Sequence, residues 1–466
     1  MFHIFFAISV KIVRDIQFQV KKMKRIMSIF NEGVLDLLAN AGVAIPYFFC
    51  LTLYNHNKSI FAYALPFLML YTFRALGMLL TTFITLPAST MLAMSSLFGV
   101  IGSLCILGAG NPVFGTIGGV FLGLASSWIW PYYLTVRSRG QMDKEFKFNR
   151  MHGLSVLLTL IILGIAQLAS TKTQFLSLSF ILLAFLFFAA MVGGLQITHR
   201  LTFYQGMEKK PKFHVNSLFS LIVLASLVML IFIIRYTRLK AVSNSFDLII
   251  SLAAIVLFLF LAYYQIDIHK KLFPLSMSAV NRGVVMNYVM LYAIFDSTIR
   301  FGYNTLMLVY ALYLIGFQVG PFLNRRHQSW RFPLLLIGLI LALFNYTYFV
   351  GLFFCAVFVG SDNRILNDGL YSNANIDSER AFLIKYQLSS VGNVSQQLVY
   401  MTTIYFISYF LKINALGFFN NNITDGPTIG ILYGVHIFIT AVVFIYAVVT
   451  FYFVHKHETK KTITTL

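Results

Sequence analysis

The sequence predicts an all-α protein that crosses a lipid bilayer many times. Its 466 residues are 59% hydrophobic and 11% charged, with a mean hydropathy of +0.79. Soluble domains carry roughly 25% charged residues, and a transmembrane helix needs about 20 mostly apolar residues. The apolar residues form continuous runs and not the alternating pattern of a membrane β-barrel, so we expect the runs to be helices.

We expect fourteen spans, of which the division at Asn345-Tyr346-Thr347 is the least marked. Without that division, residues 332–360 would form one tilted helix and the number of spans would be thirteen. The expected spans cover residues 33–54, 60–83, 90–109, 113–136, 151–170, 175–198, 216–235, 247–265, 283–301, 304–322, 332–346, 348–365, 387–410 and 428–453.

The basic residues predict that both termini lie in the cytoplasm. With this orientation, 27 of the 35 Lys and Arg residues fall in cytoplasmic segments and 6 in outer loops, as the positive-inside rule requires. The outer loop after residue 235 is the exception, because it is also basic. The same rule accounts for the net charge of +20, and no basic stretch resembles a nucleic-acid-binding module.

Both ends of the chain are basic. Residues 1–30 mix apolar and basic side chains and are expected to lie on the cytoplasmic membrane surface, unless translation starts at Met23 or Met27. Residues 456–466 form a basic cytoplasmic tail. Cys50, Cys105 and Cys355 are far apart within apolar runs, which favours free buried thiols over disulfides or a metal site.

An internal repeat divides the chain into two six-helix bundles. Asn31-Glu-Gly-Val opens the first span and Asn281-Arg-Gly-Val opens the ninth. Similar pairs follow in the same order: IFAYAL and LVYAL, FLGL and FVGL, RMHGLSV and KYQLSSVGNVS. The pattern predicts bundles at 31–198 and 283–455, with a linker and two additional spans at 199–282.

The segment Gly320 to Arg331, GPFLNRRHQSWR, joins the second and third helices of the second bundle. It resembles the signature of the major facilitator superfamily at this loop, Gly-x-x-x-Asp-Arg/Lys-x-Gly-Arg/Lys. Gly320, Arg325 and Arg326 match, Arg331 stands for the trailing basic residues, and Asn324 replaces the aspartate. The first-bundle copy (residues 77–89) has lost the signature, and the Glu-x-x-Glu-Arg motif of the proton-coupled peptide branch is missing.

That resemblance implies two bundles that rock about a central cavity. It also implies a conformational latch at Gly320, Asn324, Arg325 and Arg326, where basic groups hold helix ends or acids of the next helix. The alternative is an ordinary loop that obeys the positive-inside rule. The first helices of both bundles would line the cavity, so their polar residues are the candidates for the substrate and proton pathway.

Polar residues at membrane depth cost several kcal/mol and usually face a cavity or a partner. The candidates are Asp36, Asn40, Arg74, Asp296, Arg300 and His436. Each also has a purely structural alternative. Asp296 and Arg300 are four residues apart and can form an ion pair on one helix, and Arg74 can form one with Asp36. Asp36 can instead be solvated near the membrane interface, and His436 can be a hydrogen-bonded residue between packed helices. In the functional interpretation, a buried carboxylate beside an arginine carries a coupling proton.

The aromatic run Gly123 to Tyr133, GLASSWIWPYY, approaches the cytoplasmic end of the fourth span. Trp128, Trp130, Tyr132 and Tyr133 are expected to form an interfacial aromatic belt, with stacking on an amphipathic substrate as the alternative. Pro131 is expected to break the helix.

The sequence favours a secondary transporter and not an enzyme. No phosphate loop, metal-ligand cluster or nucleophile elbow is found, so no cofactor is expected beyond a proton or cation gradient. We expect export of an amphipathic or anionic compound across the plasma or inner cell membrane. A flippase for lipid-linked saccharides, a membrane glycosyltransferase or polymer ligase, and a membrane scaffold are the alternatives; the sequence names no protein partner.

Overall fold

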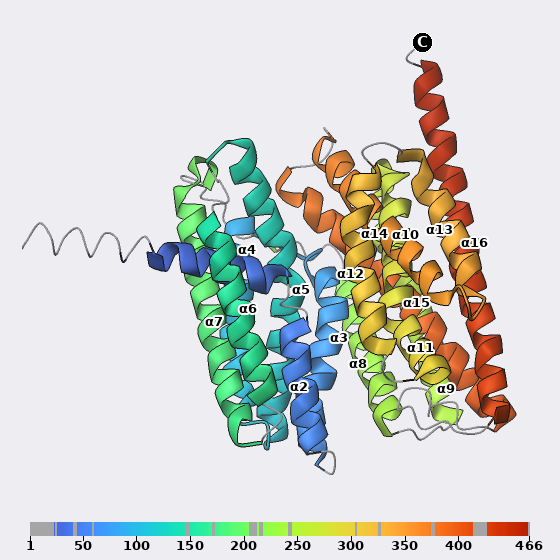
Figure 1. Cartoon of the computed structure of the whole chain (residues 1–466), viewed down its shortest axis with the longest axis horizontal. Coiled ribbons are helices and arrows are strands. Elements are labelled where there is room, and N and C mark those ends of the chain that lie inside the picture. The colour runs from blue at the N-terminus through green and yellow to red at the C-terminus, as the bar shows by residue number, and fades with distance from the viewer. Residues whose placement is uncertain are drawn as a thin grey trace, which may run out of the picture. The chain divides into compact units, whose positions relative to one another are not determined.

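The computed structural model describes residues 23, 26–40, 44–57, 60–145, 150–169, 173–204, 212–213, 218–240, 245–302, 305–324, 328–373, 378–412 and 426–464. Within these ranges the chain is almost entirely helical (Figure 1). It divides into two compact units: unit 1 comprises residues 1–77 and 86–212, and unit 2 comprises residues 78–85 and 213–466.

Unit 1 begins with a helix at residues 26–40. Its other helices are α2 (Ala44–His56), η1 (Phe61–Ala64), α3 (Leu65–Leu80, which extends past Gly77), α4 (Ala88–Ile106), α5 (Pro112–Met142), α6 (Arg150–Ala169), α7 (Thr173–Arg200) and η2 (Thr202–Tyr204). Glycines allow α4 and α5 to approach closely, since a Cβ atom on Gly102 would lie 2.9 Å from the Gly118 carbonyl oxygen.

Unit 2 holds the rest of the chain. Its helices are α8 (Leu218–Lys240), α9 (Ser245–Ile268), η3 (Lys270–Leu272), α10 (Leu275–Asn287), the π-helical turn η4 (Tyr288–Tyr292), α11 (Ala293–Phe301), α12 (Thr305–Asn324), η5 (Gln328–Trp330), α13 (Arg331–Ala342), α14 (Tyr348–Tyr371), α15 (Ser378–Leu411) and α16 (Gly426–Thr464). Two dipeptide strands, β1 (Ile84–Thr85) and β2 (Lys212–Phe213), complete the described elements.

The two units use the internal repeat in the same way. A Cβ atom on Gly33 would lie 2.4 Å from Ser155 Oγ, and one on Gly283 would overlap the Ser389 carbonyl. Each glycine thus lets its helix pack closely against another helix of the same unit, α6 for Gly33 and α15 for Gly283. The two serines also donate to main-chain oxygens of the opposing helix, Ser155 to Phe30 at 3.1 Å and Ser389 to Ala279 at 3.0 Å.

A helix is present at the place of each expected span. In the described part of the chain, seven helices are long and apolar enough to cross a membrane, or eight if one bent pair counts as a single span. The chain is therefore an integral, multi-pass membrane protein. The total of fourteen spans and the cytoplasmic placement of both termini stay predictions.

Several boundaries differ from the expected ones. The first expected span is broken, because the helices at 26–40 and 45–54 are bent by 66° relative to each other. The division near Asn345 is confirmed, since α13 ends at Ala342 and α14 begins at Tyr348. The expected break at Pro131 is wrong: α5 continues through this proline to Met142, as membrane helices often do. Residues 1–22 lie outside the described part of the chain.

Candidate functional site

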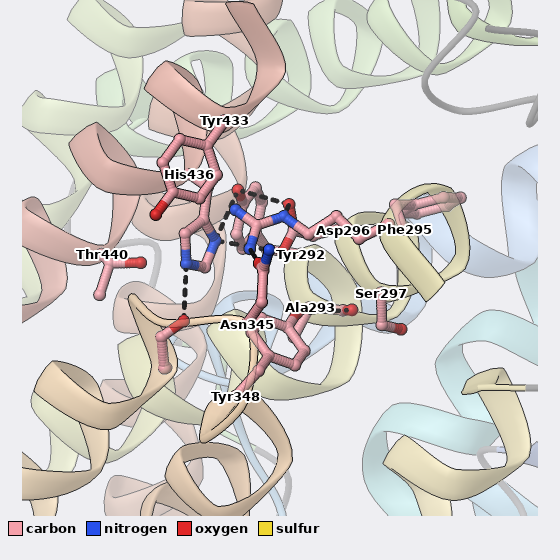
Figure 2. A network of polar contacts seen from close by, with 12 residues as sticks. Tyr292, Ala293, Phe295, Asp296, Ser297, Asn345, Tyr348, Tyr433, His436 and Thr440 are labelled. Atoms are coloured by element: carbon pink, nitrogen blue, oxygen red, sulfur yellow. Dashed lines mark hydrogen bonds and ion pairs between the residues drawn. The ribbon is translucent and has the colours of Figure 1, made fainter. Parts of the chain in front are cut away.

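The main polar network of unit 2 joins residues that are far apart in the sequence (Figure 2). Asp296 and Arg300 come from α11, His436 comes from α16, and Tyr292 ends the π-helical turn η4. A π-helical turn is rare and occurs often at functional sites. Three of the predicted site residues are therefore brought together here, although one of them lies 140 positions along the chain from Asp296.

Asp296 is the centre of this network, and its side chain is 2% exposed. Oδ1 lies 3.2 Å from Arg300 Nε, and Oδ2 lies 3.1 Å from His436 Nδ1. The Tyr292 hydroxyl lies 3.4 Å from Oδ1. The carboxylate is thus placed between an arginine and a histidine, both also largely buried.

His436 is fully buried, and its partners define where its protons lie. Nε2 is 2.9 Å from the Ala342 carbonyl oxygen, which can only accept a hydrogen bond, so Nε2 carries a hydrogen. Nδ1 lies 3.1 Å from Asp296 Oδ2 and 3.2 Å from the Tyr292 hydroxyl, with which it shares a hydrogen bond. Asp296 Oδ2 forms no hydrogen bond in this arrangement, so His436 and Asp296 are close enough to exchange a proton without a hydrogen bond between them.

Arg300 closes one side of the network. Its Nη1 donates to Asn345 Oδ1 at 3.1 Å, and its Cζ lies 4.6 Å from the Tyr433 ring centroid and 5.7 Å from that of Tyr348. Its Nη2 is buried without a hydrogen-bond acceptor. The guanidinium thus has one donor group available to a further acceptor.

Sequence reasoning missed the aromatic and amide members of this network: Tyr292, Asn345, Tyr348 and Tyr433. Tyr292 lies four residues before Asp296 and so on the same helix face, which is a signal that could have identified it. The positions of Asn345, Tyr348 and Tyr433 depend on how α13, α14 and α16 pack, and no local pattern encodes that packing.

Asp36 and Asn40 form a second polar group, in unit 1. Asp36 Oδ1 accepts from Arg137 Nη1 at 3.0 Å and from the Tyr133 hydroxyl at 2.8 Å. Asn40 Nδ2 donates to the Asp36 carbonyl oxygen at 2.7 Å. Arg137 of α5 is thus a partner of Asp36 that the sequence did not suggest, and the carboxylate is buried and not solvated. The pairing of Asp36 with Arg74 stays a prediction.

Glu32 lies one turn before Asp36 and holds two bases. Oε1 is 2.6 Å from Arg200 Nη2, and Oε2 is 3.0 Å from His152 Nε2. None of these three residues was among the predicted site candidates.

The aromatic run of α5 does not form an interfacial belt. Trp128, Tyr132 and Tyr133 are each at most 3% exposed. Trp128 Nε1 donates to the Gly77 carbonyl oxygen at 2.8 Å, and Tyr133 binds Asp36. Their polar atoms therefore serve contacts within unit 1, and the belt interpretation is wrong for these three residues.

Only part of the predicted latch lies in the described residues. Gly320 packs against α14, where its carbonyl oxygen accepts from Ser361 Oγ at 2.8 Å, and Asn324 is the last residue of α12. Arg325 and Arg326 lie outside the described residues. The trailing Arg331 forms the kind of contact expected of a latch, because its Nη1 lies 3.3 Å from Oδ1 of the fully buried Asp362 on α14.

All three cysteines are free thiols; Cys50 and Cys355 are buried as expected, whereas Cys105 is only partly buried. Within the described ranges, no three His, Cys, Asp or Glu side chains gather as metal ligands would.

No family model and no curated protein matches this chain. Among solved structures, its fold is similar to that of a POT family transporter crystallised with a thioalcohol-conjugated peptide, with a TM-score of 0.51 and 13% identity. The alignment covers 93% of this chain and 96% of that one. The nucleoside transporter NupG aligns over 91% of this chain and 98% of its own, with a TM-score of 0.42 and 11% identity. The match to the POT family transporter shows that the two chains share a similar fold over nearly the whole length of this chain.

Proposed function

We propose that this protein is a secondary active transporter of the major facilitator type, and that the Asp296–His436 pair carries its coupling proton. The observation that supports this most directly is the hydrogen-bond pattern of His436. Because Nε2–H is committed to Ala342, Nδ1 is the nitrogen that can exchange a proton with Asp296 Oδ2, which lies 3.1 Å away.

The surroundings of the pair suit reversible proton binding. Arg300 neutralises the Asp296 carboxylate when the proton leaves, and the Tyr292 hydroxyl, 3.2 Å from His436 Nδ1, can donate to whichever atom is then bare. A conformational change that separated Arg300 from Asp296 would favour the protonated carboxyl group, since an adjacent positive charge stabilises the carboxylate. Such a change would couple proton binding to rocking of the two bundles.

The same network supports an amphipathic or anionic substrate. The rings of Tyr433 and Tyr348 flank the Arg300 guanidinium, and Arg300 Nη2 has no acceptor. A ligand with an apolar body and an acidic group would use both features. Export is the proposed direction of transport.

The test begins with a thermal-shift screen of the purified full chain against amphipathic drugs, lipid-linked saccharides and small anions. A ligand stabilises the fold according to its occupancy. We expect a hit whose shift is lost in Asp296→Asn and Arg300→Ala while both variants remain folded. A hit confined to lipid-linked saccharides would instead identify a flippase.

The second step places wild type and Asp296→Asn in proteoliposomes with an imposed pH gradient. In wild type we expect the rate of ligand uptake to depend on the pH gradient. In the variant we expect the ligand to exchange across the membrane at a rate that does not depend on the gradient. Vesicles of known sidedness determine the direction. Gradient-driven uptake that is unchanged in Asp296→Asn would refute the assigned proton site, and no ligand shift in any form would refute the transporter.

A further inference from the structure

The strongest unassigned feature is a buried pair of cations in unit 2, Arg282 on α10 and Lys385 on α15. Arg282 is 3% exposed and Lys385 is 0% exposed. Both flank the ring of Tyr386: its centroid lies 5.9 Å from Arg282 Cζ and 4.3 Å from Lys385 Nζ. Across the described residues, neither cation forms an ion pair with a carboxylate.

The nearest acid is already occupied by other groups. Asp362 Oδ1 binds Arg331 at 3.3 Å and Ser278 Oγ at 2.9 Å. Lys385 Nζ donates to the amide oxygens of Asn363, at 2.9 Å, and Asn367. Those contacts satisfy hydrogen bonds and supply no negative charge. Since an arginine does not lose its proton in a protein, the excess positive charge persists even if Lys385 is neutral.

Arg282 and the residue before it in the chain both carry buried hydrogen-bonding atoms without a partner. Arg282 Nη1 donates weakly to Ser389 Oγ at 3.3 Å, and Arg282 Nε has no acceptor. The neighbouring Asn281 is 0% exposed, and neither its Nδ2 nor its Oδ1 has a partner. A buried polar atom without a partner costs about 1–3 kcal/mol, so the site offers two unused donor groups, one unused acceptor and an uncompensated charge.

We propose that Arg282, Lys385 and Asn281 bind a phosphate group. Two cations match its double negative charge, and guanidinium groups suit phosphate oxygens. A protonated phosphate oxygen would also donate to Asn281 Oδ1. Arg282 and Lys385 precede the expected spans at 283–301 and 387–410, so a phosphate group, free or on a lipid, would approach them from the side expected to be cytoplasmic. The proposal stands independently of proton coupling at Asp296.

The repeat supports the assignment. Glu32 occupies the position in unit 1 that Arg282 occupies in unit 2, and its two bases compensate it there. Unit 2 has the base Arg282 at this position, and no carboxylate among the described residues forms an ion pair with it.

The experiment measures equilibrium binding of radiolabelled inorganic phosphate to the purified full chain in detergent. We expect saturable binding that Arg282→Gln weakens about tenfold or more. Arg364→Gln is the control, because Arg364 is on α14 but pairs with the exposed Asp368. In parallel, nanodiscs with and without phosphatidic acid test the lipid source by native mass spectrometry. Lipid retention by wild type that is lost in Arg282→Gln supports the same site.

A second variant guards against a folding defect in Arg282→Gln. Asn281→Asp puts a carboxylate beside Arg282, so we expect it to raise the melting temperature without phosphate and to abolish phosphate binding. The proposal is overturned if neither phosphate nor phosphatidic acid binds, or if Arg282→Gln binds phosphate as tightly as wild type does. It is also overturned if Asn281→Asp lowers the melting temperature, because the new carboxylate would then be a buried charge that no cation compensates.

Discussion

Removing either partner of the Asp296–Arg300 pair is expected to have unequal effects, because His436 touches only the acid. Asp296→Ala leaves the Arg300 guanidinium, whose side chain is 10% exposed, without a counter-charge. Loss of one member of a buried pair costs about 3–5 kcal/mol. Arg300→Ala leaves Asp296 in contact with His436, which can hold a proton, so we expect a loss of about 1–3 kcal/mol.

The double variant completes the comparison. Asp296→Ala combined with Arg300→Ala removes the orphaned charge, so its cost is expected to be smaller than the sum of the two single costs by about 1–3 kcal/mol. Equilibrium unfolding in mixed detergent micelles at pH 6 measures all three. Arg364→Ala, at a half-exposed pair with Asp368, should change stability by less than about 1 kcal/mol. A loss in Arg300→Ala equal to or above that in Asp296→Ala would refute the role given to His436.

Two further predictions concern unit 2. Gly283→Ala puts a Cβ atom on top of the Ser389 carbonyl oxygen, so we expect the free energy of unfolding to fall by about 1–3 kcal/mol or more in the same assay. Gly430→Ala is the control, because a Cβ atom there meets nothing within 4 Å, and it should be neutral or stabilising. Burial lowers the pKa of His269, which follows α9, from 6.5 to about 4. The unfolded chain then binds more protons between these values, so stability is full above pH 6.5 and falls by up to about 3 kcal/mol as the pH drops to 4. His269→Gln should flatten this part of the stability profile, and an unchanged profile would contradict the assignment.

The sequence alone determined the class of protein and the positions of its helices. Long apolar runs exclude a soluble fold because no soluble core could bury them, and each run became a helix because a backbone in lipid must satisfy its own hydrogen bonds. The pair of Asp296 and Arg300 was also predictable, since residues four apart share a helix face. The glycine of each Asn-x-Gly-Val repeat lies at a close contact between helices in both units.

The tertiary structure decided which helix faces meet. His436 reaches Asp296 from α16, and Arg137 reaches Asp36 from α5. Trp128 was expected at the membrane interface and is instead buried with its indole nitrogen bonded to Gly77. The periodicity of a helix fixes which residues share a face, but the partner of that face depends on packing between segments that are distant in the chain. The sequence likewise does not show whether Arg282 has an acidic partner. Only the packing of the helices shows that no carboxylate among the described residues pairs with it.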